Sequence, residues 1–387
     1  MPPATMNRRT FLTAGSLLPA MVRALGAESL AIEPGFVPLF DGTSLAGWSV
    51  QAGPASAFRV MDGSIVVDQG SNFPTWLRSD KQYENFDFRC EFFLRGWMNS
   101  GVYLHAPEHG RNTWVGMKIN LFHQADAQPK PESVGSIFPL IAPKAINVKG
   151  QAEWNSLRAL MDWPRLQVWM NDTLVQDLDV GTVPELRHRL RRGYIGFESL
   201  SYPIRFRNIR IQELPSQETW QALYEAPDDF AKWQVSSGKP IFEPRGAILR
   251  GDGNGQIATR GTFRDFVLHM YIRGVAHHNG GVMFRSIPAT PGGRGQSYEI
   301  QLHDVEGAHY ATGSLYSIKR AMYPRIEPEQ WFLFQLVVQD RRCLVRINGD
   351  TVMEYEGLEN LEAGRIELQA HDAGKWIEYK QVKIRRL

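Results

Sequence analysis

Two short stretches of the sequence place an acid, an amide and an imidazole at alternate positions. These stretches are residues 298–304 and 366–371, and an extended strand would point their polar and apolar side chains to opposite faces. The polar members are Glu299, Gln301, His303, Glu367, Gln369 and His371. Carboxylates and imidazoles move protons in catalysis, and amides hold polar substrates by hydrogen bonds. We therefore predict a polar site on one face of a β-sheet.

Apolar and aromatic residues recur in short runs between turn residues, as in residues 86–94, 117–122 and 205–211. Such runs are typical of β-strands, and the long periodicity of amphipathic helices is absent. Asn171-Asp172 and Asn348-Gly349 end two of the runs with residues that tolerate the positive φ angles of tight hairpins. The pattern predicts an all-β sandwich or jelly roll.

The second half of the chain repeats the motifs of the first half. Asn99 matches Asn279 and Trp154 matches Trp331, at offsets of 180 and 177 residues. A chain of 387 residues is too long for one ordinary core, and an offset of this size is that of a domain. We therefore predict two tandem domains of the same fold, at residues 34–214 and 220–387, joined by a short link that contains a proline.

The motifs of the duplicated unit resemble those of a known family. They include Leu39-Phe40-Asp41-Gly42, Asn99-Ser100-Gly101-Val102, Glu153-Trp154-Asn155, Phe206-Arg207-Asn208-Ile209 and, in the second copy, Ser297-Tyr298-Glu299-Ile300-Gln301. The family was long catalogued as DUF1080 and is now described as 3-keto-disaccharide hydrolases or 3-keto-glycoside lyase-like domains. The resemblance implies a concanavalin A-like β-sandwich with a carbohydrate site on its concave face, and a 3-keto-glycoside as the substrate.

A comparison of the two copies assigns the polar face to the second copy. The first copy replaces Glu299, Gln301 and His303 by Lys118, Asn120 and Phe122, and it replaces Glu367, Gln369 and His371 by Gly196, Glu198 and Leu200. The first copy thus keeps the scaffold motifs and loses the combination of acid, amide and imidazole. If the protein is an enzyme, we expect its chemistry in the second copy.

The implied substrate suggests roles for these residues. A ketone at C3 makes the C2 proton of a glycoside acidic, so a base can remove it, the C1 oxygen can leave, and water can add. The predicted catalytic residues are Glu299 or His303 as the base and His371 or Asp304 as the acid. The predicted substrate-binding residues are Arg285, Gln301, Gln369 and Asn279.

Each residue also has a purely structural interpretation. Glu299 can be a solvated strand carboxylate, the histidines can be edge residues, and Asp304 can be a turn residue that ends its strand. A divalent metal ion stays open as a cofactor, because Glu, His and Asp are competent ligands although no tight metal-binding motif occurs.

Two other functions remain open. The first is a non-catalytic carbohydrate-binding sandwich, favoured in the first copy by four aromatic residues, Trp97, Tyr103, Trp114 and Phe122. The second is that the first copy only supports the second through a large interface, in which case residues 220–387 alone should be insoluble or unstable. No phosphate loop, dinucleotide fingerprint or nucleophile elbow occurs, which argues against nucleotide chemistry and acyl transfer.

Charge and cysteine content restrict partners and compartment. The formal net charge is +2, so we expect neither nucleic acid nor an acidic membrane as partner. We interpret the basic run at residues 187–192 as a solvated loop, with an anionic-ligand patch as the alternative. Cys90 and Cys343 lie in strand-like runs and are predicted to be buried thiols without a disulfide.

The N-terminus has the layout of an export signal. Arg8-Arg9 precedes a short apolar run that resembles a twin-arginine signal over residues 1–27. This run is too short to span a bilayer, so we expect no transmembrane helix in the mature chain. The expected location is the periplasm or the extracellular space.

Overall fold

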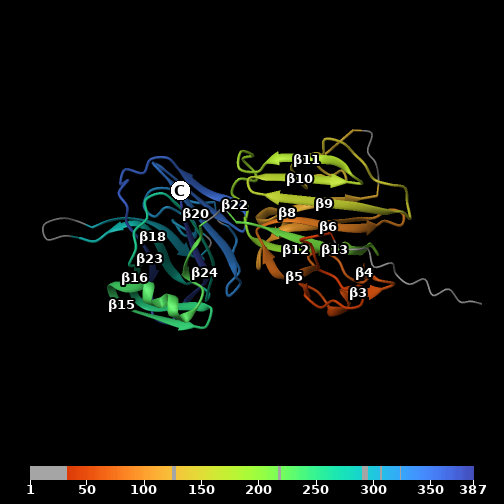
Figure 1. Cartoon of the computed structure of the whole chain (residues 1–387). Coiled ribbons are helices and arrows are strands. Elements are labelled where there is room, and N and C mark those ends of the chain that lie inside the picture. The colour runs from red at the N-terminus through yellow and green to blue at the C-terminus, as the bar shows by residue number, and fades with distance from the viewer. Residues whose placement is uncertain (1–32, 124–127, 217–218, 290–294, 306, 323) are drawn as a thin grey trace, which may run out of the picture.

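The computed structural model describes residues 33–123, 128–216, 219–289, 295–305, 307–322 and 324–387. Within them strands dominate, and the only helical pieces are α1 (Asn112–Val115) and the 3-10 turns Ala55–Ala57 and Pro227–Lys232. The strands form two lobes that lie side by side (Figure 1). The predicted fold, an all-β chain of two tandem sandwiches, is confirmed.

The first domain consists of two antiparallel sheets. The larger sheet contains β11 (Thr173–Asp179), β10 (Arg165–Met170), β9 (Trp154–Asp162), β6 (Asn85–Phe93), β13 (Arg205–Leu214), β4 (Ser64–Val67), β3 (Phe58–Met61) and β1 (Val37–Pro38). The smaller sheet contains β2 (Trp48–Gln51), β5 (Trp76–Tyr83), β12 (Gly193–Glu198), β7 (Asn99–Ala106) and β8 (Met117–Phe122).

The second domain repeats this arrangement in one continuous sheet. Its strands run in the order β19 (Gln296–His303), β18 (Asn279–Ile287), β23 (Arg365–Ala370), β16 (Ile248–Thr259), β24 (Ile377–Arg386), β17 (Phe266–Gly274), β20 (Phe332–Gln339), β21 (Arg342–Ile347) and β22 (Asp350–Tyr355). In addition, β14 (Gln221–Tyr224) pairs with β24, and β15 (Trp233–Arg245) pairs with β16. The long strand β16 joins the two halves, because its start pairs with β24 and its end with β23.

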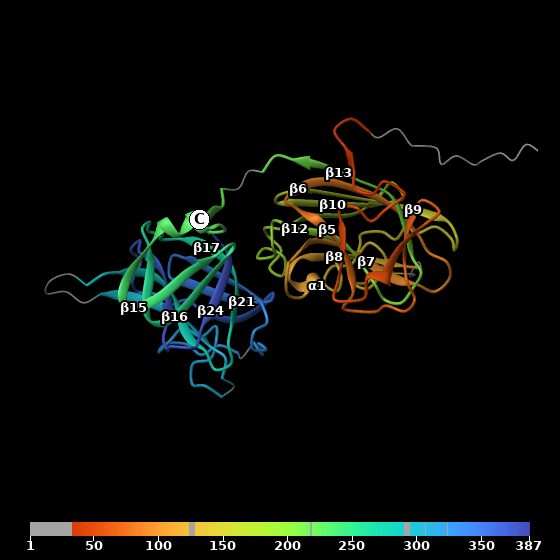
Figure 2. The same cartoon turned by 90° about the horizontal axis from the view of Figure 1, so that it is seen from below.

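Each domain has its own hydrophobic core. The buried cluster of the first domain runs from Phe40 to Ile211, and that of the second runs from Leu223 to Ile384. Alternation along the strands produces these cores, since Ile300 and Leu302 of β19 are fully buried while their polar neighbours face outward. The chain passes between the lobes once, after β13 (Figure 2).

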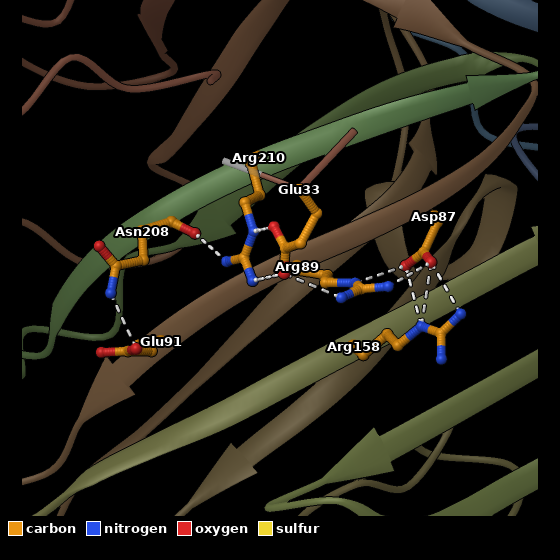
Figure 3. A network of polar contacts seen from close by, with 7 residues as sticks. All are labelled: Glu33, Asp87, Arg89, Glu91, Arg158, Asn208 and Arg210. Carbon is orange, nitrogen blue, oxygen red and sulfur yellow. Dashed lines mark hydrogen bonds and ion pairs between the residues drawn. The ribbon is translucent and has the colours of Figure 1, made fainter. Parts of the chain in front are cut away.

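Charged residues cover the outer face of the larger sheet of the first domain (Figure 3). Asp87 on β6 accepts hydrogen bonds from Arg89 and from Arg158 on β9, the latter at 2.7 Å from Nη2. Arg210 on β13 donates to Glu33 at 2.7 Å, and this bond lowers the pKa of Glu33 to about 2. Ion pairs of this kind keep a broad sheet face compatible with solvent.

The matching face of the second domain carries a different set of residues. The strand pair that holds Arg89 opposite Arg210 in the first domain holds His269 opposite Lys383 in the second. Tyr271 and Leu333 are buried beside Val115 and Leu190 of the first domain. The phenol of Tyr271 also accepts a hydrogen bond from the backbone N–H of Glu108 at 2.9 Å. The first domain therefore covers this face of the second domain, whereas the equivalent face of the first domain is exposed.

The basic run at residues 187–192 belongs to this domain interface, and its interpretation as a solvated loop is wrong. Arg189 is only 4% exposed and donates to the carbonyl oxygens of Thr113 and Gly116. The carbonyl oxygen of His188 accepts a hydrogen bond from Gln335 of the second domain at 3.0 Å. The run therefore serves in packing, since its backbone contacts the second domain while the Arg189 side chain is bonded within the first.

The remaining sequence predictions concern the termini and the cysteines. Cys90 and Cys343 are buried free thiols, as predicted. In the described part of the chain, no helix has both the length and the apolar character needed to cross a membrane. The predicted export signal at residues 1–27 lies outside the described residues.

Candidate functional site

The strand order of the second domain brings the two polar stretches together. β18 lies between β19 and β23, so the polar residues of the outer strands share one face of three neighbouring strands. Gln301 and Gln369 are both opposite Gly281, and Glu299 and Glu367 are both opposite Met283. The apolar residues of the same strands point into the core. We call this surface the polar face.

Glu299 lies near the middle of the polar face. A Cβ atom on Gly281 would lie 2.5 Å from Oε1 of Glu299, so the carboxylate extends over this glycine, between Gln301 and Gln369. Burial raises the pKa of Glu299 above its ordinary value, and the charge of His371 opposes this effect. Among the described residues, no side chain is hydrogen-bonded to this carboxylate. A half-buried carboxyl group without a partner is suited to proton transfer.

The two histidines lie at one end of the polar face. His303 is opposite Asn279 in the strand ladder, and the backbone N–H of His371 donates to the carbonyl oxygen of Asn279. Nδ1 of His371 lies 3.2 Å from a carboxylate oxygen of Asp372, and half of the His371 side chain is exposed. Successive outward rows on a strand are about 7 Å apart. Glu299 is opposite Met283 and His303 is opposite Asn279, so the row of Gln301 and Gln369 lies between the backbone positions of the acid and the imidazoles.

Amide side chains line the floor between these groups. Gln301 donates from Nε2 to Oδ1 of Asn279 at 2.9 Å, which fixes the orientation of both amides. Gln369 is half-buried and is opposite Gln256 of β16, whose amide oxygen accepts from Ser237. Of the predicted residues, the structure thus brings Glu299, Gln301, Gln369, Asn279, His303 and His371 to one face.

Asp304 has an enclosed side chain, unlike the residues of the polar face that are open to solvent. Its side chain is 3% exposed, and Oδ2 accepts the backbone N–H of His277 at 3.1 Å. The same oxygen lies 3.7 Å from Nδ1 of His278, whose pKa is lowered mainly by burial although the charge of Asp304 opposes this. Asp304 therefore positions the loop before β18, and it cannot serve as an acid in contact with substrate.

Arg285 is also placed away from the polar face, which corrects its predicted role in substrate binding. Its side chain is fully buried, and its guanidinium donates to the carbonyl oxygens of Arg264 and Asn360 and to the carboxylate of Asp265. The register of β18 shifts between Phe284 and Ile287, and Arg285 has a positive φ of 47°. The bulge turns this side chain inward, so strict alternation fails there.

An aromatic residue that the sequence patterns did not indicate lies beside Glu299. The backbone N–H of Tyr316 donates to the carbonyl oxygen of Glu299 at 2.9 Å, and the residue is 49% exposed. The ring of Tyr310 packs 5.2 Å away from that of Tyr316. An exposed phenol ring next to a carboxylate can stack on the apolar face of a sugar. Only the copy comparison could have indicated Tyr316, since Phe138 is its counterpart.

The first domain fills the corresponding face with a buried ion pair. Nζ of Lys118 lies 2.6 Å from Oε2 of Glu198, and both side chains are nearly enclosed. The hydroxyl of Tyr103 donates to the other oxygen of Glu198 at 2.8 Å, and the ring of Phe138 lies 4.2 Å from Nζ. The stem of Lys118 lies over Gly101, as Glu299 lies over Gly281. Lys118 and Glu198 neutralise each other, so neither is available as an acid or a base at this position of the face.

The donor set does not fit a resident metal ion. Among the described residues, no three His, Cys, Asp or Glu side chains converge as a metal centre requires. The side chain of Asp304 is nearly enclosed and accepts the backbone N–H of His277, and the row of Gln301 separates Glu299 from His303 along β19. No step of the chemistry below is therefore assigned to a metal.

A pocket lies away from the polar face, between the two domains. It has a volume of about 370 Å³, and its lining includes Glu84, Glu108, Glu225, Tyr271 and Lys383. Its carboxylates are engaged, because Glu108 pairs with Lys380 at 2.9 Å and Glu225 with Lys383 at 2.9 Å. A pocket of this size is the usual first choice for a site, but its carboxylates are paired, whereas no described side chain is hydrogen-bonded to Glu299 on the polar face.

Comparison with known sequences now identifies the family. The sequence matches the family described as the 3-keto-alpha-glucoside-1,2-lyase-like domain over residues 35–212 and again over residues 219–385. The chain belongs to this family. The prediction of two copies is confirmed, and membership places the chain in a family of carbohydrate-active domains. No curated protein sequence matched the chain.

Solved structures of similar shape match one domain at a time. One is a protein from Parabacteroides distasonis ATCC 8503, provisionally described as a glycosyl hydrolase, with 20% identity over 47% of this chain and 94% of its own, and a TM-score of 0.42. Another is a carbohydrate-binding module from Bacillus subtilis, with 15% identity over 40% of this chain and 95% of its own, and a TM-score of 0.29. Likeness at this level carries no argument about chemistry.

Proposed function

We propose that the second domain cleaves 3-keto-α-glucosides by proton abstraction at C2. The observation that carries this proposal is the half-buried carboxylate of Glu299, which has a raised pKa and no hydrogen-bond partner among the described residues. Membership of the family described as 3-keto-alpha-glucoside-1,2-lyase-like supports the class of substrate. The position of the carboxylate on an open face of amides and imidazoles supports sugar binding.

The reaction begins when Glu299 takes the proton from C2, and the electron pair of that bond moves to the C3 ketone as an enolate. Amide N–H groups can stabilise such an oxyanion, and Gln369 lies beside the carboxylate across Gly281. The enolate then expels the C1 oxygen, which forms a C1–C2 double bond. The leaving oxygen takes a proton from an acid and departs as an alcohol. The products at this stage are an enone and the aglycone.

His371 is the acid in this proposal. Its Nδ1 lies 3.2 Å from a carboxylate oxygen of Asp372, which leaves Nε2 for the leaving group. His303 lies across Asn279 in the same row and can hold a hydroxyl of the aglycone. Addition of water at C1, with return of a proton to C2, gives net hydrolysis without any oxidant or reductant.

Tyr316 and the amides position the substrate in this proposal. The exposed ring of Tyr316 lies beside Glu299 and would stack on the sugar, while Gln301 is oriented by its bond to Asn279. The substrate must be supplied by an enzyme that oxidises C3 of a glycoside. Export through the predicted twin-arginine signal at residues 1–27 is part of the proposal, with the periplasm or the extracellular space as the place of action.

The test replaces Glu299 by Gln, which keeps the volume and removes the base. With methyl 3-keto-α-D-glucopyranoside as substrate, the wild-type protein should release methanol, and Glu299→Gln should be slower by about 10²- to 10⁴-fold. Glu356→Gln serves as the matched control, because that carboxylate is 76% exposed and lies 3.8 Å from Arg342. Equal rates in all three proteins would contradict the proposal, as would equally fast cleavage of unoxidised methyl α-D-glucopyranoside.

A further inference from the structure

An exposed aromatic cluster lies on the first domain. Trp97 is 65% exposed, and its indole is held by the rings of Phe122, His123 and Tyr202 at centroid distances of 6.1, 5.3 and 5.9 Å. Burial of so large an apolar ring would normally contribute stability, yet most of this one stays in water. A supported and exposed indole is the usual platform on which a sugar ring stacks.

The position of this cluster corresponds to that of the histidines in the second domain. Trp97 precedes β7, His123 follows β8 and Tyr202 follows β12, so all three lie at one end of the smaller sheet. In the second domain His303 ends β19 and His371 follows β23 at the same end of the matching strands. Where the second domain carries two imidazoles, the first domain therefore carries three larger aromatic rings together with the imidazole of His123.

Two amide oxygens beside the cluster lack partners among the described residues. Oδ1 of Asn99 and Oδ1 of Asn120 are buried and accept no hydrogen bond from that part of the chain, and Asn120 is only 1% exposed. In the second domain the matching pair is satisfied, since Gln301 donates to Asn279. Asn120 is one methylene shorter than Gln301, and its amide nitrogen donates instead to the carbonyl oxygen of Glu132 at 2.6 Å. Orphaned acceptors of this kind call for donors from water or from a ligand.

The charges of this face are internally balanced. Lys118 and Glu198 pair with each other under Phe138, so the face offers neither a base for C2 nor an attraction for a charged sugar. Asn99 is directly opposite Phe122 in the strand ladder, which puts an acceptor next to an aromatic ring. Apolar rings with hydrogen-bond acceptors and no net charge match a neutral pyranose, which presents C–H groups on one face and hydroxyl donors at its edge.

We propose that the first domain is a non-catalytic binding site for neutral glycans, with Trp97 as its stacking residue and Asn99 and Asn120 as acceptors. The site tethers the chain to an oligosaccharide while the second domain acts on small 3-keto-glycosides. Binding at Trp97 does not depend on the chemistry proposed for Glu299, so the two proposals can fail separately.

The test is calorimetric titration of the full chain with maltohexaose, cellohexaose and xylohexaose in turn. At least one of the three should bind the wild-type protein, and Trp97→Ala should weaken that binding by tenfold or more. Trp97→Phe keeps a ring and should retain most of the affinity. Trp169→Ala is the matched control, because Trp169 lies on the other sheet of the same domain, beside Arg158. The affinity of the Trp169→Ala variant for the hexasaccharide should equal that of the wild type.

Two further readouts separate this site from the one in the second domain. Trp97→Ala should turn over methyl 3-keto-α-D-glucopyranoside at the wild-type rate, and Glu299→Gln should bind the hexasaccharide as the wild type does. The proposal is overturned if none of the three hexasaccharides binds, or if Trp97→Ala binds as tightly as Trp169→Ala. It is equally overturned if Glu299→Gln, and not Trp97→Ala, abolishes the binding.

Discussion

At the scale of single residues, Glu299 is controlled by two opposing influences. Burial raises its pKa, and the positive charge of His371 lowers it. A base must be ionised to accept the C2 proton, so the acidic limb of the pH–rate profile should follow the pKa of Glu299. The limb should therefore lie above the ordinary range of a glutamate.

His371→Gln should move this limb to higher pH. Loss of a positive charge disfavours the carboxylate form of Glu299, so its pKa rises and more alkaline solution is needed to ionise it. The measurement is the dependence of kcat/KM on pH between about 4 and 8. His371→Lys keeps a positive charge and should leave the limb near its wild-type position. A limb that stays in place in His371→Gln would contradict the electrostatic role of this residue.

Alternation along strands was sufficient to predict which residues share the polar face, because Glu299, Gln301 and His303 lie on regular β19. It failed for Arg285, since a bulge in β18 turns that side chain into the core. Alternation gave no signal for Tyr316, because this residue lies in a turn beyond the strand and not in an alternating run. The partners of a side chain, such as the loop that Asp304 holds, depend on packing that the sequence pattern does not encode.

At the scale of elements, the equivalent strands of the two copies carry different polar side chains on the same face. The strand pair of the first domain neutralises Lys118 with Glu198, and the corresponding pair of the second leaves Glu299 without a hydrogen-bond partner in the described part of the chain. A buried pair is a poor source of net stability, but removal of one member leaves an uncompensated charge. The ion pair therefore fills the face of the first domain with little loss of folding free energy as long as both residues are present.

Lys118→Met should destabilise the first domain by about 3–5 kcal/mol, because it leaves the carboxylate of Glu198 buried without its cation. The combined variant Lys118→Met with Glu198→Gln should recover most of this loss. Unfolding in urea, followed through the transition of the first domain, measures both. If the single and double variants unfold at the same urea concentration, the ion pair has no such role.

At the scale of the whole molecule, the two copies have the same fold but different outer faces. The outer face of the first domain carries ion pairs such as Asp87 with Arg158, whereas the second places Tyr271 and Leu333 there, against the first domain. The duplication itself could be predicted from repeated motifs, and the family match confirms it. How the copies pack could not be predicted, because each interface residue occurs once and leaves no repeating pattern.

Residues 219–387 expressed alone should aggregate. Tyr271 and Leu333 are 4% and 2% exposed in the full chain, and loss of the first domain would uncover them together with Trp331. Light scattering of the purified fragment measures the outcome. The same fragment with Tyr271→Lys and Leu333→Lys should be monomeric. A soluble monomer without these changes would show that the first domain is not needed to cover this face.

The central claim, that Glu299 of the second domain removes the C2 proton of a 3-keto-glucoside, is tested most directly by the fate of that hydrogen. The substrate is methyl 3-keto-α-D-glucopyranoside with deuterium at C2, cleaved in ordinary water and analysed by mass spectrometry early in the reaction. The account predicts that the wild-type protein releases sugar that has lost the deuterium to solvent, and that Glu299→Gln does so far more slowly. Sugar that retains all of its C2 deuterium after cleavage would contradict the account.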